Sequence, residues 1–175
     1  MLKHTAHKSI HINPKINLSF IVFNNKKFLH VKDYNKYFFI PYNINCVLEK
    51  EVLVLKSSEQ ELELNFVYHS ILSFFRSVVN PVKKTLKLKG LGFRITLHKN
   101  LLELKLGFSH LKSIRVPSIL NVIIKKNIIS VEGVDAAVVG NFISKIKSLK
   151  QPDAYKGKGF WYKYEKESFK TIKKK

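Results

Sequence analysis

Residues 152–162 carry the side chains best suited to chemistry in this sequence. They read Pro-Asp-Ala-Tyr-Lys-Gly-Lys-Gly-Phe-Trp-Tyr, so two lysines alternate with two glycines inside an aromatic frame. Ammonium groups neutralise phosphate charge, and glycine lets the backbone come close to a phosphate. The aromatic rings could stack on unpaired bases or ribose, or they could close a hydrophobic core beside a flexible loop. We call residues 152–162 the basic loop and predict that it binds phosphate groups.

Motifs for catalysis or metal binding do not stand out elsewhere. Gly90 and Gly92 could open a dinucleotide-binding motif, but Ile95 stands where its third glycine belongs and a strand is expected to follow. The sequence has no Gly-x-x-x-x-Gly-Lys-Ser/Thr loop, no Gly-x-Ser-x-Gly motif and no His-Glu-x-x-His spacing. The single cysteine, Cys46, cannot form an intrachain disulfide or a zinc site of several cysteines. We therefore expect no enzymatic activity, no metal, no cofactor and no small-molecule substrate.

The chain is strongly basic, with 32 Lys and Arg against 12 Asp and Glu in 175 residues and a net charge of +20. Residues 1–84 hold 12 basic and 6 acidic side chains, for +6, whereas residues 85–175 hold 20 and 6, for +14. Self-repulsion at this charge favours a polyanionic partner, bound mainly by the second half. Of the basic residues 29 are lysines, which AT-rich coding favours over arginine, but such coding does not favour basic over acidic residues.

The hydrophobic content of 45% is enough for a folded core and excludes a wholly disordered basic protein. The longest stretches without a formal charge, 37–48 and 64–75, have 12 residues each. A transmembrane helix needs about 18 or more apolar residues. We therefore expect no membrane span.

Hydrophobic periodicity predicts strands followed by one helix in each half of the chain. In the first half, strands are expected at 16–20, 28–31, 37–40 and 52–55, and a helix over 67–78 before Pro81. In the second half, strands are expected at 86–88, 93–97, 102–106, 114–116, 122–124 and 128–131, and a helix over 138–149. Asp135 is the expected N-cap of that second helix, and Pro152 ends it.

This pattern predicts an α+β protein of two tandem small domains, each an antiparallel or mixed sheet with a helix packed on one face. The expected limits are 1–84 for a divergent N-terminal domain and 85–175 for a C-terminal domain that binds RNA. The second domain would contain the basic loop and a lysine-rich tail, 163–175, expected to be a solvated electrostatic arm.

Four pieces of the second half resemble, in order, the universal large-subunit ribosomal protein six family of the bacterial type. These pieces are residues 88–94, 106–110, 131–135 with 139–140, and 155–159, of which the last is close to a family signature. The resemblance covers about half of the chain, and the first half fits by length and element order. Two departures are Ala154, where the family has a second proline, and Leu111, where the family has proline after the histidine.

The resemblance implies two similar α+β domains, of which the C-terminal one binds large-subunit rRNA near the sarcin–ricin region and the factor-binding side. It implies principal rRNA contacts in the basic loop and the tail, at Tyr155, Lys156, Gly157, Lys158, Gly159, Trp161, Lys163, Lys170, Lys173, Lys174 and Lys175. Secondary candidates are Lys89, Arg94, Ser109 and His110. The expected partners are large-subunit rRNA and neighbouring ribosomal proteins.

We therefore expect a structural constituent of the large ribosomal subunit that supports translation. The lysine-rich composition and a start that lacks the look of a transit peptide favour an organelle-encoded protein of the mitochondrion, ahead of a plastid or an AT-rich bacterium. The alternative is a free-standing RNA-binding regulatory module that is not fixed in the ribosome.

Overall fold

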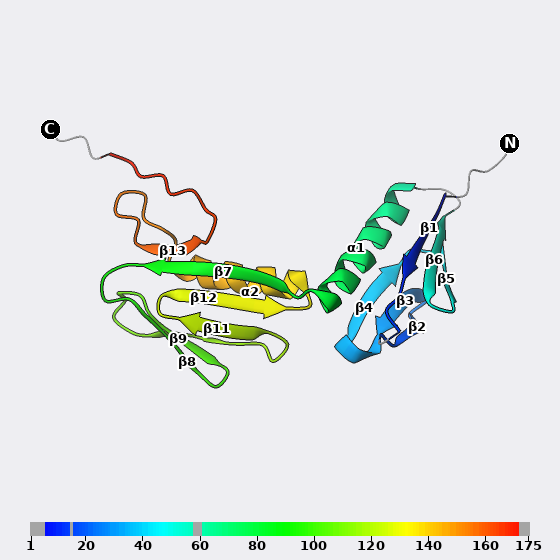
Figure 1. Cartoon of the computed structure of the whole chain (residues 1–175), viewed down its shortest axis with the longest axis horizontal. Helices are drawn as coiled ribbons and strands as arrows, with labels where there is room; N and C mark the ends of the chain where they lie inside the picture. The colour runs from blue at the N-terminus through cyan, green and yellow to red at the C-terminus, as the bar shows by residue number, and fades with distance from the viewer. Residues whose placement is uncertain (1–5, 15, 58–60, 172–175) are drawn as a thin grey trace. The chain divides into compact units, whose positions relative to one another are not determined.

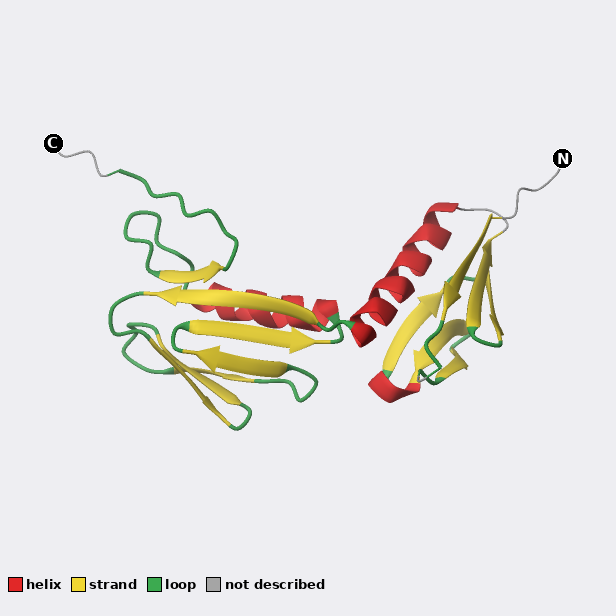
Figure 2. Ribbon diagram, in the orientation of Figure 1, coloured by secondary structure: helices red, strands yellow, loops and turns green. Residues whose placement is uncertain are grey.

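The computed structural model describes residues 6–14, 16–57 and 61–171 (Figure 1). The chain divides into two compact units, Met1–Arg76 and Ser77–Lys175. Each unit combines antiparallel sheets with a helix, so the expected α+β class with two tandem domains is confirmed (Figure 2). The limit expected after residue 84 falls inside a strand, β7 (Val82–Lys89), and the division lies before that strand.

The first unit contains two three-stranded antiparallel sheets. One has the order β1 (Ala6–His11), β6 (Val52–Ser57) and β5 (Ile44–Glu49), and the other has β2 (Leu18–Phe23), β3 (Lys26–Val31) and β4 (Lys36–Ile40). A short 3₁₀ helix, Lys32–Tyr34, joins β3 to β4. Asn24 and Asn25 form the tight turn between β2 and β3, with positive φ angles of 46° and 57°. The periodicity missed β1 and β5, because among their residues only Ile10 and Ile44 are buried.

Helix α1 (Glu61–Val79) covers the core of the first unit and starts six residues before its predicted limit. Its buried apolar side chains are Leu64, Val67, Ile71, Phe74 and Phe75. This spacing forms one helical stripe, as expected. The ring of Phe74 packs edge-on against Phe38 of β4, with centroids 5.4 Å apart.

The second unit also has two antiparallel sheets. The larger has the order β11 (Asn121–Lys125), β12 (Ile128–Gly133), β7 and β13 (Gly159–Tyr162). The smaller has the order β10 (Lys112–Arg115), β9 (Leu101–Lys105) and β8 (Arg94–His98). Each half thus holds two sheets rather than the single sheet that periodicity suggested.

Helix α2 (Ala136–Leu149) packs against the sheet that contains β7, β12 and β13. Its buried residues, Val139, Phe142, Ile143 and Ile146, join one core with both sheets. The expected N-cap is confirmed, because Asp135 Oδ1 accepts a hydrogen bond from the backbone N–H of Ala137 at 3.0 Å.

Strand β13 was not predicted. It consists of the last four residues of the basic loop and pairs antiparallel with β7, with Gly159 opposite Lys89 and Phe160 opposite Leu88. This pairing ties the end of the basic loop to the domain core. Within the described residues, neither helix is long and apolar enough to cross a membrane.

Candidate nucleic-acid interface

The basic loop is a closed turn built around Asp153. The carboxylate of Asp153 accepts hydrogen bonds from the backbone N–H of Tyr155 at 3.1 Å and of Lys156 at 3.2 Å. Its backbone N–H donates to the carbonyl of Lys158 at 3.0 Å, and its carbonyl accepts from the N–H of Gly157 at 2.9 Å. Such side-chain bonds to nearby backbone groups are typical of aspartate-capped turns. The acid therefore shapes the loop.

The cations of the loop point outward. Lys156 and Lys158 are both exposed, as is Tyr155, which keeps 54% of its surface accessible. Within the part of the chain that the structure describes, neither lysine forms an ion pair with a carboxylate. Both ammonium groups are therefore available to a polyanion.

The two glycines have a different role from the one expected. Gly157 and Gly159 are buried, with φ angles of +64° and +142°. A Cβ on Gly157 would lie 2.5 Å from the Phe169 ring, and one on Gly159 would lie 2.6 Å from the backbone oxygen of Gln151. Because protein atoms cover both glycines, they do not offer their backbone to a phosphate. They allow the loop to pack against its surroundings.

The aromatic residues of the loop are divided between core and surface. Phe160 is fully buried, and Trp161 keeps only 6% of its surface accessible. The indole N–H of Trp161 donates to the carbonyl of Gly157 at 2.9 Å. A buried ring cannot stack on a base, so the expected role of Trp161 in RNA contact is corrected to a role in holding the loop. Tyr155 is the ring of the basic loop that stays exposed.

The tail does not behave as a free arm over its described part. The backbone N–H of Lys170 donates to the carbonyl of Ala154 at 2.9 Å, and the N–H of Lys163 donates to the carbonyl of Thr85 at 3.1 Å. Figure 1 shows the segment after β13 running back over the basic loop. Lys163 and Lys170 are nevertheless exposed. Lys173, Lys174 and Lys175 lie outside the described residues.

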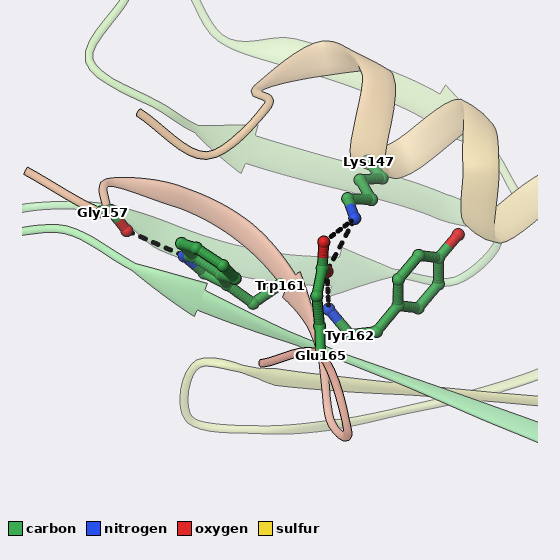
Figure 3. A network of polar contacts seen from close by, with 5 residues as sticks. All are labelled: Lys147, Gly157, Trp161, Tyr162 and Glu165. Atoms are coloured by element: carbon green, nitrogen blue, oxygen red, sulfur yellow. Dashed lines mark hydrogen bonds and ion pairs between the residues drawn. The ribbon is translucent and has the colours of Figure 1, made fainter. Parts of the chain in front are cut away.

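A charged network fixes the turn after β13 (Figure 3). The carboxylate of Glu165 accepts hydrogen bonds from Lys147 Nζ at 2.8 and 2.7 Å and from the backbone N–H of Tyr162 at 2.9 Å. The Lys147 ammonium also lies over the Tyr162 ring, 4.3 Å from its centroid. The hydrogen bonds from Lys147 and then from Tyr162 lower the pKa of Glu165 below its ordinary value.

The secondary candidate residues lie at the same end of the second unit. Lys89 pairs with Gly159 across β7 and β13. The ring of Phe93 lies against both Gly90 and Gly107, and so joins the turn before β8 to the turn after β9. The structure therefore brings together three segments: the basic loop, the turn before β8 and the turn after β9.

The cations at this end differ in availability. Arg94, Ser109 and His110 are exposed, and Ser109 Oγ lies 3.1 Å from His110 Nδ1. Lys89 is half-buried and forms an ion pair with Glu167, so its charge is already neutralised.

Sequence reasoning missed two lysines that flank Phe108. Lys150 and Lys112 lie over the Phe108 ring, 4.8 and 5.7 Å from its centroid, and Phe108 is 42% exposed. The carbonyl of Lys150 also accepts the N–H of Phe160, which links this cluster to β13. No linear spacing reveals the cluster, because its members come from separate elements.

Other features of the described residues do not suggest a reactive site. No group of three or more His, Cys, Asp or Glu side chains among them could hold a metal ion. Burial raises the pKa of the Cys46 thiol to about 12, which disfavours the nucleophilic thiolate. A groove of about 570 Å³ in the first unit lies between β4 and α1 and is lined mostly by apolar residues, including Phe39, Leu62 and Phe66.

Comparison with known proteins gives a family match that lies within the second unit. Residues 89–163 match the family model described as Ribosomal protein L6. Large ribosomal subunit protein uL6 of Nautilia profundicola is 40% identical over 95 residues, which cover 53% of each chain. Large ribosomal subunit protein uL6 of Mycoplasmopsis pulmonis is 39% identical over 105 residues, 59% of each chain. Large ribosomal subunit protein uL6c of Guillardia theta is 34% identical over 125 residues, 69% of this chain and 70% of that protein.

The matched residues span about half the length of the first of these relatives and more than two thirds of the uL6c protein. All three relatives are named as large-subunit ribosomal proteins.

Proposed function

This chain belongs to the ribosomal protein L6 family, and from that premise we propose that it is a structural constituent of the large ribosomal subunit. In this proposal the second unit binds large-subunit rRNA and the protein supports translation. Its partners are that rRNA and neighbouring ribosomal proteins. The relatives' names support the large-subunit assignment, and the charge of the second unit supports RNA as the ligand.

The observation that carries the proposal is the convergence of three polar segments at one end of the second unit. The exposed groups there are Tyr155, Lys156, Lys158, Arg94, Ser109, His110 and Lys170. Exposed Lys163 lies further along the sheet, where its backbone N–H binds the carbonyl of Thr85. Lysine ammonium groups and exposed rings suit phosphates and unpaired bases, so we infer that this end reads backbone and shape more than base sequence. Gly157, Gly159 and Trp161 support the same site from inside the loop.

The position that we propose for this unit, near the sarcin–ricin region and the factor-binding side, rests on the family resemblance. Footprinting of large-subunit rRNA tests it directly. Protection of the sarcin–ricin region by the bound chain is the expected result, and protection confined to a distant region would refute it.

We further propose that the protein is encoded in an organelle, the mitochondrion first. The abundance of lysine over arginine supports an AT-rich genome, and the relatives include both bacterial and plastid proteins. Locating the coding sequence tests this proposal. A nuclear or bacterial location would exclude it.

Sedimentation of the tagged chain through gradients at low and high salt tests the ribosomal role. Co-migration with the large subunit at both salt concentrations is expected. The affinity of purely phosphate-based binding falls steeply as salt rises, whereas a binding site that also fits the RNA in shape keeps its affinity. The free-standing RNA-binding module would instead migrate with small ribonucleoprotein particles. Release as a free chain at moderate salt would count against the ribosomal role.

A further inference from the structure

The segment after β13 is anchored back onto the domain at several points. We call residues 163–171 the strap. Its first anchor is Glu165, which binds Lys147 of α2 and the backbone of Tyr162 (Figure 3). Its second anchor is the ion pair between Glu167 and Lys89 of β7. These contacts fix the first part of the strap to the helix and the sheet.

The far part of the strap lies on the basic loop itself. The Phe169 ring packs against Gly157, where even a single added Cβ would come within 2.5 Å of it. The same ring meets Trp161 edge-on, with centroids 6.1 Å apart. The N–H of Lys170 donates to the carbonyl of Ala154 in the loop.

Gly157 is therefore held from two sides. Trp161 binds its carbonyl from the core, and Phe169 covers it from the strap. Lys156 and Lys158 flank this clamped residue, and both point outward. Clamping Gly157 thus limits the positions that the two ammonium groups can take.

We propose that the strap is a positioning element that presets the basic loop for RNA, with Phe169 and Glu165 as its positioning residues. This inference rests on the proposed function of the second unit. Neither residue need touch RNA: the strap orders the loop before RNA arrives, so binding loses less conformational entropy and strengthens without added charge. The lysines of the strap add charge, but its aromatic and acidic anchors do not.

The test compares Phe169→Ala with Tyr164→Ala in the full chain. Both variants remove one aromatic ring from the strap and leave the net charge unchanged. Tyr164 is 89% exposed, and Phe169 contacts Gly157 and Trp161. The first readout is amide hydrogen exchange at Lys156 and Gly157 in the free protein. Exchange is expected to accelerate in Phe169→Ala and to stay unchanged in Tyr164→Ala, and equal exchange in the two variants would overturn the proposal.

The second readout is affinity for transcribed large-subunit rRNA of Mycoplasmopsis pulmonis, with the small-subunit rRNA of the same organism as a non-specific probe. Phe169→Ala is expected to weaken large-subunit binding roughly three- to tenfold, as suits one aromatic contact, and to leave non-specific binding unchanged. Unchanged affinity for the large-subunit RNA would overturn the positioning role.

Two controls separate the possible failures. If denaturant causes no change in the fluorescence of Trp161 in Phe169→Ala, this variant does not fold. Phe169→Leu and Glu165→Gln then replace it. Faster loop exchange is expected in Glu165→Gln and wild-type exchange in Phe169→Leu, which keeps the apolar contact. If the wild-type chain shows no preference for large-subunit rRNA, the proposed function fails, and loop exchange still decides whether the strap holds the loop.

Discussion

Buried glycines decide the shape of the basic loop at the scale of single residues. Gly157 and Gly159 both have positive φ angles and lie against neighbouring atoms. From the sequence, we expected these two glycines to let the backbone come close to a phosphate. The structure uses them instead to bring the loop, the strap and residue 151 close together. Within the basic loop, the proposed contacts with phosphate therefore fall to the exposed side chains of Lys156 and Lys158.

Gly159→Ala is therefore expected to destabilise the second unit by at least about 2 kcal/mol, because its new Cβ meets backbone atoms at an unfavourable φ. Gly92→Ala is the matched control. Gly92 has a φ of +74° but no atom within 4 Å of the new Cβ, so a loss of only about 1 kcal/mol is expected. Urea unfolding followed by the fluorescence of Trp161, the single tryptophan, measures both. Equal losses would show that packing at Gly159 is unimportant.

Glu165 links stability to pH. Its pKa is lowered in the folded chain by the hydrogen bonds from Lys147 and Tyr162. A lowered folded-state pKa stabilises the fold above the unfolded-state value of 4.5, and this contribution disappears as pH falls through the folded-state pKa. At neutral pH, Glu165→Gln is expected to cost about 1 kcal/mol.

The difference in unfolding free energy between wild type and Glu165→Gln is expected to shrink as pH falls below about 4.5. Urea unfolding at pH 7, 5, 4 and 3 measures this difference for both chains. A difference that stays constant across these pH values would mean that the carboxylate charge does not stabilise the turn.

At the scale of elements, the helix stripes and most strands were predictable from sequence. The Val67–Phe75 region and the Val139–Ile146 region place apolar residues at helical spacing, and their side chains are buried as expected. Strand β1 could not be predicted in this way, because its pairing with β6 depends on residues more than forty positions away. Local periodicity carries little information about such long-range pairing.

The charge of the candidate site could be predicted from the sequence, but the arrangement of its side chains could not. The alternation of lysine and glycine pointed to the basic loop, and Lys156 and Lys158 are exposed there. The place of Trp161 depended on β13, a four-residue strand in a segment rich in loop-forming residues. Trp161 is buried in the core because β13 pairs with β7, and no local sequence pattern predicts this pairing.

The N-cap of α2 gives a prediction at this scale. Asp135→Ala removes the acceptor for the backbone N–H of Ala137 and is expected to destabilise the second unit by about 1 kcal/mol. Asp135→Ser keeps a capping oxygen and is expected to cost much less. Urea unfolding monitored by Trp161 fluorescence tests the pair of variants, and a serine variant as unstable as the alanine variant would argue against the cap.

At the scale of the whole molecule, charge is concentrated more sharply than the sequence halves indicated. With the division after residue 76, the first unit has 10 basic and 6 acidic side chains, for +4. The second unit has 22 basic and 6 acidic side chains, for +16. Two of the acids in the second unit, Glu165 and Glu167, anchor the strap to lysines.

This distribution predicts that equal changes of charge have unequal effects in the two units. Lys156→Ala with Lys158→Ala removes two positive charges from the basic loop, and Lys26→Ala with Lys27→Ala removes two exposed charges from the first unit. The loop variant is expected to weaken binding to large-subunit rRNA about tenfold or more. The slope of log affinity against log salt concentration, here called the salt slope, is expected to decrease in magnitude by about 2. Each removed lysine leaves one phosphate without its cation. It is also expected to impair incorporation into the large subunit.

The first-unit variant carries the same net charge as the loop variant and separates position from total charge. Its salt slope is expected to stay close to that of wild type. Both double variants should unfold at wild-type urea concentrations, because all four lysine side chains are exposed. If affinity and salt slope decrease equally in the two variants, binding depends on total charge, and the basic loop is not a specific RNA contact. If the loop variant incorporates normally, the principal contact must lie elsewhere in the second unit, with the tail as the next candidate.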